Sequence, residues 1–119
     1  IIMGRLERTA AVCIDAPEKL DAMKDRIKRA IDECDGGEGV LILTDMFGGT
    51  PANLSLAFLE EGKVEVLTGF NLPMLIKLAS YRAEGHSLAD AASFICAYGQ
   101  RNISVASELL RSKKTEAKS

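Results

Sequence analysis

Apolar residues fall into two patterns along the chain: short runs, and longer stretches with helical spacing. Three short runs have the length of buried strands, namely residues 9–14 (TAAVCI), 40–43 (VLIL) and 64–67 (VEVL). Between and after them, apolar side chains recur every three or four residues, which is typical of amphipathic helices that cover a sheet. The order strand, helix, strand, helix, strand, helix predicts an α/β fold, with a parallel sheet and helices on its faces.

Start and stop signals bound the first three expected helices. Residues 15–18 (DAPE) place a proline and acidic side chains where a first helical turn favours them, and Gly36-Gly37 ends that helix. Its predicted apolar face consists of Leu20, Met23, Ile27, Ala30, Ile31 and Cys34. The second helix is expected over residues 51–59 (PANLSLAFL), and the third begins near Pro73.

A last helix is expected from near Leu88. Residues 87–90 (SLAD) resemble a capping box with Asp in place of the usual Glu. Gly99 interrupts the pattern and indicates either a bend or close packing. The predicted apolar face consists of Leu88, Ala92, Ile95, Ile103, Ala106 and Leu110.

The first of two glycine-containing turns occupies residues 44–53 (TDMFGGTPAN). Asp45 places a carboxylate just beyond a strand, and Gly48-Gly49 allows a tight turn close to a ligand. Thr50 is a suitable N-cap before a first-turn proline. Free amides at such a helix start can bind a phosphoryl group, although the same residues also serve as an ordinary strand-to-helix turn.

The second turn, residues 69–73 (GFNLP), follows the next strand and also leads to a helix started by proline. The carboxyl ends of parallel strands meet at one edge of a sheet, and ligands bind outside that edge. Both turns are therefore expected to line one anion-binding crevice.

Composition and charge narrow the class of protein. The 119 residues fit a single domain, 1–119, with a polar, flexible tail from about 111 to 119. Fifteen basic and seventeen acidic residues give a net charge of −2, which does not favour binding to nucleic acid or to an anionic membrane. No apolar run approaches the roughly 20 residues of a membrane-spanning helix, so a cytoplasmic protein is expected.

Cysteines and known motifs indicate neither a metal nor a cofactor. Cys13, Cys34 and Cys96 are far apart, lack zinc-ligand spacing and are interpreted as reduced core thiols. A Walker A motif and G-x-G-x-x-G are both absent, which disfavours nucleotide binding. Asp45 is suited either to orient a histidine or to cap local amides. The one histidine, His86, lies in a polar turn and is not expected to be catalytic.

With both turns in view, the chain resembles the IIA proteins of the mannose, fructose and sorbose family of the bacterial phosphotransferase system. The resemblance rests on residues 40–53 (VLILTDMFGGTPAN) and 69–75 (GFNLPML), and on their order and separation. It implies a doubly wound α/β domain, usually a homodimer. It further implies a phosphocarrier that takes a phosphoryl group from HPr and passes it to a IIB component, with the membrane IIC and IID components as indirect partners.

Taken residue by residue, the resemblance implies that Asp45 is the carboxylate that supports a phosphorylated histidine. It also implies phosphoryl-binding residues in the two turns: Phe47, Gly48, Gly49, Thr50 and Asn71. No metal or organic cofactor is implied.

The phosphorylated histidine of the family has no counterpart in this sequence. In the family it follows the first strand in a Thr-His-Gly or Ser-His-Gly turn, and a helix then leads to the region that matches Ile1 to Gly4. The sequence also does not open with an initiator methionine. We therefore expect roughly 25 further residues upstream, which is the length of one strand and one helix.

Two other functions stay open at this point. One is a regulatory or interaction module that has the fold and the dimer but no phosphoryl transfer. The other is the related phosphoryl-transfer subunit of a dihydroxyacetone kinase, although the turns 48–51 (GGTP) and 71–74 (NLPM) look more like the sugar-transport branch.

Overall fold

The computed structural model describes residues 8–12, 19–45 and 50–111, apart from the side chains of residues 50–52. The elements follow in the order α1 (Leu20–Cys34), β1 (Val40–Thr44), α2 (Thr50–Leu56), β2 (Val64–Thr68), α3 (Leu72–Tyr81), the 3₁₀ helix η1 (Arg82–Glu84) and α4 (Leu88–Arg101). Beyond α4, residues 106–111 are again helical.

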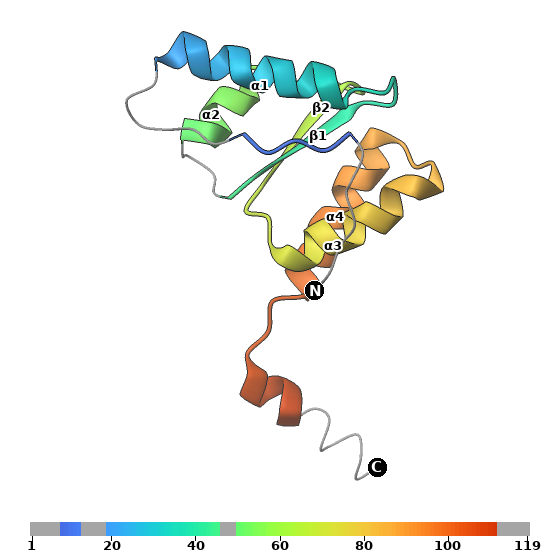
Figure 1. The fold of residues 1–119 in the computed structure, drawn as a ribbon. Coiled ribbons are helices and arrows are strands. Elements are labelled where there is room, and N and C mark those ends of the chain that lie inside the picture. Colours follow the sequence, from blue (N-terminus) through green and yellow to red (C-terminus); the bar gives the residue numbers. More distant parts are fainter. Residues whose placement is uncertain (1–7, 13–18, 46–49, 112–119) are drawn as a thin grey trace.

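The two strands form a parallel sheet between two layers of helices. Val40 pairs with Val64, and the register continues to Thr44 and Thr68. Figure 1 shows α1 and α2 on one face of this sheet and α3 and α4 on the other. The arrangement confirms the predicted α/β fold with helices on both faces.

Each face of the sheet has its own apolar core. On one side, Met23 and Ile27 of α1 pack with Leu54 of α2. On the other, Leu67 of β2 packs with Met74 of α3 and Ile95 of α4, joined by Leu41 and Leu43. Met74 and Ile95 are the most deeply buried, with 2% and 0% of their surface exposed. Burying one such side chain stabilises the fold by about 1.5–3 kcal/mol.

The prediction of a strand over residues 9–14 is wrong for the part that the structure describes. Residues 9–12 have no regular secondary structure, and residues 13–14 lie outside the described part of the chain. Side chains hold the segment in place: Val12 packs against the cluster of α1 and α2, and the Thr9 hydroxyl accepts a hydrogen bond from Arg82 at 3.0 Å. The expected burial is also wrong for residues 9–11, which are exposed, and Val12 is only partly buried. A short apolar run by itself therefore fixes neither burial nor pairing in a sheet.

The first helix and the second also differ in part from the sequence prediction. Leu20 was expected on the inner face of α1 but is 60% exposed, whereas Met23 and Ile27 are buried as predicted. Helix α2 ends at Leu56 and gives way to a turn before Leu59. The predicted start at residues 15–18 lies outside the described residues.

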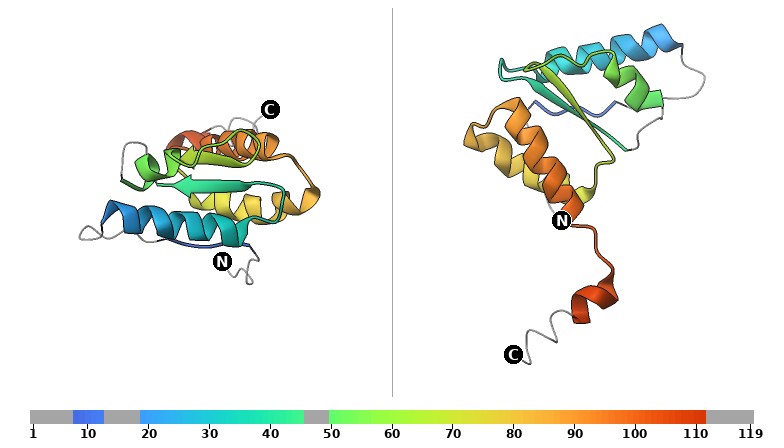
Figure 2. Two further views of the ribbon diagram at one scale, coloured as in Figure 1. Left: turned by 90° about the horizontal axis from the view of Figure 1, so that it is seen from above. Right: turned by 180° about the vertical axis from the view of Figure 1, so that it is seen from behind.

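The last helix is shorter than its apolar pattern predicted. It starts at Leu88, as expected, but ends at Arg101, and Asn102 caps it by donating to the carbonyls of Tyr98 (2.8 Å) and Gly99 (3.2 Å). Residues 102–111 then leave the body of the molecule (Figures 1 and 2), so no core covers them. The exposed apolar side chains of this arm are Ile103, Val105, Leu109 and Leu110.

Of the two cysteines that the structure describes, only Cys96 lies against a core, so the prediction of core thiols is confirmed for Cys96 and not for Cys34. Cys34 and Cys96 are free thiols of intermediate burial, and Cys96 packs against the cluster of α3 and α4. Cys13 lies outside the described residues.

Candidate functional site

One backbone carbonyl joins the two predicted turns at the carboxyl edge of the sheet. The Thr44 carbonyl oxygen, at the end of β1, accepts hydrogen bonds from the backbone N–H groups of Gly69 (2.8 Å) and Phe70 (3.1 Å). Gly69 has φ +79°, a conformation that residues with side chains rarely adopt, which explains the glycine at this point. The second turn is therefore fixed against the residue that precedes Asp45.

Asp45 directly follows β1 and is exposed to solvent. Its carboxylate is thus available to a partner group at the edge where the second turn also lies. This position agrees with the prediction that the two turns meet there, while the role of the carboxylate stays a prediction.

Asn71 is the N-cap of α3, and its side chain is also bound to α4. Its Oδ1 accepts from the backbone N–H of Met74 at 3.2 Å, and its own backbone N–H donates to the Met74 sulfur at 3.3 Å. Its Nδ2 donates to the carbonyl oxygen of Gly99 at 3.0 Å. The side-chain amide has one further hydrogen on Nδ2, so these contacts do not use its full capacity as a donor.

Most of the other predicted phosphoryl-binding residues lie where the structure gives no description. Phe47, Gly48 and Gly49 fall within residues 46–49. Thr50 is the first residue of α2, and its side chain is not described. Their assignment as phosphoryl-binding residues stays a prediction.

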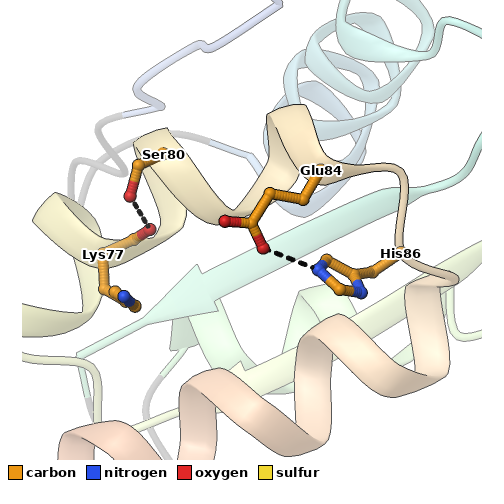
Figure 3. Close-up of polar contacts among 4 residues, drawn as sticks. All are labelled: Lys77, Ser80, Glu84 and His86. Atoms are coloured by element: carbon orange, nitrogen blue, oxygen red, sulfur yellow. Dashed lines mark hydrogen bonds and ion pairs between the residues drawn. The ribbon is translucent and has the colours of Figure 1, made fainter.

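His86 lies beyond the other end of α3 from Asn71. Helix α3 has 10 residues and is therefore about 15 Å long at 1.5 Å per residue. The His86 Nε2 is 2.9 Å from a Glu84 carboxylate oxygen (Figure 3), and the imidazole stacks on the Tyr81 ring at 3.9 Å between centroids. The structure does not bring His86 to the two turns.

Within residues 8–12, 19–45 and 50–111, the structure shows neither a metal-binding cluster nor a membrane-spanning helix. Within these ranges, His, Cys, Asp and Glu form no group of three that could hold a metal ion. Of the helices described there, none combines the length and apolar character needed to cross a bilayer.

Sequence reasoning missed two parts of this site. The Thr44 carbonyl was not recognised, because a backbone acceptor leaves no trace in the residue type. At Gly99 the sequence indicates only a bend or close packing. Helix α4 runs unbroken through it, and the second alternative is correct: Gly99 is buried against Met74.

The chain is similar to IIA components of sugar phosphotransferase systems. The model of the family described as "PTS system fructose IIA component" matches residues 1–95. The fructose-specific EIIA component of Bacillus subtilis (strain 168) is 31% identical over 116 residues, which cover 97% of this chain and 79% of that protein. The sorbose-specific EIIA component of Lacticaseibacillus casei is 34% identical over 80 residues, 66% of this chain and 57% of that protein.

A longer relative and a solved structure agree with these matches. The mannose-specific EIIAB component of Escherichia coli (strain K12) is 23% identical over 104 residues, and the chain spans about a third (32%) of its length. The crystal structure of the PTS IIA protein associated with the fucose utilization operon from Streptococcus pneumoniae aligns with a TM-score of 0.67 and 30% identity. The alignment covers 80% of this chain and 68% of that one.

Proposed function

The chain belongs to the family of PTS fructose IIA components, and we propose that its protein relays a phosphoryl group from phospho-HPr, through a histidine, to a IIB component. Membership of this family makes it a component of a sugar phosphotransferase system. The relay, its direction and a cytoplasmic location are our proposal. The relay needs neither a metal nor an organic cofactor.

The observation that supports the proposal best is the shared acceptor at the end of β1. Gly69 and Phe70 both donate to the Thr44 carbonyl, so Asp45 and the second turn occupy one edge of the sheet. An exposed carboxylate beside a fixed turn suits a site to which a partner protein must gain access. Parallel α/β sheets bind their ligands at this edge.

In the proposed reaction, an imidazole nitrogen attacks the phosphorus of phospho-HPr. A new N–P bond forms as the N–P bond to HPr breaks, and its electron pair returns to the HPr imidazole. Asp45 accepts the N–H on the other side of the attacking ring, which keeps the reacting nitrogen unprotonated. The amides of residues 48–50 hold the phosphoryl oxygens, so the protein acts mainly through positioning and charge stabilisation.

The attacking histidine is the part of the proposal that this sequence does not supply. The family resemblance places it upstream of the region that matches Ile1. His86 is a poor substitute because it stacks on Tyr81 at the far end of α3. A IIB histidine or cysteine then takes the phosphoryl group in a second attack of the same kind.

We also propose that the protein is a homodimer. Four apolar side chains of the arm at residues 102–111 are between 48% and 74% exposed, namely Ile103, Val105, Leu109 and Leu110. A second copy that covers this arm would remove apolar surface from water. Sedimentation of the full-length protein tests this point, and a monomer at micromolar concentration would contradict it.

The relay is tested on the full-length protein, with any residues that its gene encodes before Ile1. Incubation with phosphoenolpyruvate, enzyme I and HPr should add the mass of one phosphoryl group. Asp45→Asn should slow acceptance by about 10²-fold, as expected for loss of one charge-stabilising group. Asp25→Asn, on the exposed face of α1, is the matched control and should leave the rate unchanged.

Two outcomes would contradict the relay. No mass increase on the wild-type protein, with partner binding intact, would instead favour the regulatory or interaction module. Phosphoryl acceptance that requires a dihydroxyacetone kinase rather than a IIB component would favour the kinase subunit.

A further inference from the structure

We infer that Asn71 is a positioning residue, whose side-chain amide ties the second turn (residues 69–71) to helix α4 and so fixes that turn beside Asp45. The contacts that support this inference are independent of the reaction. Its consequence for phosphoryl transfer rests on the proposed function.

The second turn is held at both of its ends, by different parts of the molecule. At its start, the N–H groups of Gly69 and Phe70 bind the Thr44 carbonyl, which fixes the turn to the sheet. At its end, Asn71 Nδ2 donates at 3.0 Å to the carbonyl of Gly99, a residue of α4 that lies 28 positions further along the chain. Two anchors on separate elements restrict rotation of the turn more than either anchor alone.

The helix end provides the acceptor for this bond. Because α4 ends at Arg101, the Gly99 carbonyl is one of the last four of the helix and has no N–H partner four residues ahead within it. It accepts from the N–H of Asn102 at 3.2 Å and from Asn71 Nδ2. A helix that continued through residue 103, as its apolar pattern predicted, would direct a backbone N–H at the same carbonyl.

The anchor on α4 is also firmly packed. Gly99 is buried, and a β-carbon there would lie only 2.6 Å from Cγ of Met74. The sulfur of the same Met74 accepts the backbone N–H of Asn71, and Met74 lies in the core with Ile95. Asn71, Met74 and Gly99 thus form one packed unit, and movement of the turn would disturb a core whose members are nearly fully buried.

Positioning of this kind affects the chemical step more than the binding of a protein partner. A displacement of about 1 Å at a reacting group can slow a reaction about 10²-fold. If the link from Asn71 to α4 is lost, we expect kcat for phosphoryl acceptance to fall about tenfold, while KM for phospho-HPr stays within about twofold.

Two substitutions of Asn71 test the inference, because they remove its bond to Gly99 of α4 but keep its role as the N-cap of α3. Asn71→Asp keeps an oxygen that accepts from Met74 N–H, because Asp is a good N-cap, but it cannot donate to Gly99. Asn71→Ser is a second cap-preserving variant, whose shorter side chain does not span the distance to α4. Asn102→Asp is the matched control, because it removes a similar bond, from Asn102 Nδ2 to the Tyr98 carbonyl, at the exposed end of the same helix.

Two measurements are made on the full-length protein and each variant: hydrogen exchange of the Gly69 and Phe70 amides, and kcat and KM with phospho-HPr. Both variants at Asn71 should speed exchange at these two amides by about tenfold and lower kcat, and Asn102→Asp should do neither. Exchange rates equal to wild type in both Asn71 variants would refute the positioning role.

The outcomes distinguish this inference from the proposed function. Faster exchange with an unchanged kcat would show that the turn moves without effect on the reaction, which would overturn the catalytic part of the inference. A wild-type protein that accepts no phosphoryl group would refute the proposed function, while the exchange rates would still decide whether Asn71 holds the turn.

Discussion

Gly99 of α4 lies directly against the side chain of Met74 of α3. A β-carbon at position 99 would come within 2.6 Å of Met74 Cγ, closer than real β-carbons approach another atom. Glycine at position 99 therefore leaves the space that the Met74 side chain occupies. This contact brings α3 and α4 together beneath the second turn.

Gly99→Ala should lower the free energy of unfolding by about 1 kcal/mol. Alanine in a helix is favoured by about 1 kcal/mol over glycine, but overpacking a core costs about 1–3 kcal/mol, so the second effect is larger. Urea unfolding measures the difference, with the exposed neighbour Gln100→Ala as control. The loss should shrink in a Met74→Ala background, and an equal loss in both backgrounds would contradict this explanation.

Ser87→Ala should destabilise the protein by about 1 kcal/mol through loss of a helix cap. The Ser87 hydroxyl accepts from the backbone N–H of Asp90 at 3.2 Å, at the start of α4. Ser87→Asp should restore stability, because a carboxylate also caps that N–H. Ser93→Ala, on the exposed face of the same helix, should cause no loss. Equal losses at both serines would argue against a capping effect.

Thr44→Val should leave stability unchanged or raise it by up to about 1 kcal/mol. The Thr44 side chain is buried, and among the described residues its hydroxyl has no hydrogen-bond partner. An unpaired buried hydroxyl costs about 1–3 kcal/mol, and valine has nearly the same shape. Thr68→Val, at the paired position of β2, is the control. A loss above about 1 kcal/mol only at position 44 would show that the hydroxyl is hydrogen-bonded after all.

His86→Ala should not change phosphoryl acceptance by the full-length protein. His86 stacks on Tyr81 and contacts Glu84, so its removal is expected to cost at most about 1 kcal/mol of stability. His86→Phe keeps a ring for stacking and should be closer to wild type in thermal unfolding. Mass spectrometry after incubation with phosphoenolpyruvate, enzyme I and HPr checks the first point. If the phosphoryl group disappears with the imidazole, His86 is the acceptor and our proposal is wrong.

Apolar runs and helix-start residues in the sequence correctly predicted parts of the fold, among them one strand and the starts of two helices. The strand at residues 40–43 was placed by its apolar run, and the starts of α3 and α4 were placed by Pro73 and Ser87. The family resemblance implied that Asn71 binds a ligand, and the structure shows that it caps α3. Its bond to Gly99 was not predicted, because that bond depends on tertiary packing that no local pattern encodes.

The errors occurred where a pattern fits more than one environment. An apolar run such as residues 9–14 suits a buried strand, but residues 9–12 form no strand, and of these only Val12 packs against a core. The apolar residues keep helical spacing as far as Leu110. Residues 102–111, however, lie away from the core, so the apolar side chains there have nothing to pack against (Figure 1). Periodicity shows which residues share a face and does not show whether anything packs against it.

The stacked rings beside α3 determine which half of the molecule is visible to fluorescence. The sequence has no tryptophan and two tyrosines. Tyr81 lies between His86 and Phe94, and Tyr98 stacks on Phe94 in turn, so both emitters sit on the layer of α3 and α4. Intrinsic emission will therefore report the opening of that layer alone. Separation of α1 and α2 from the sheet will be silent unless a dye is attached on their side, for example at the Cys34 thiol in a variant whose Cys13 and Cys96 are replaced.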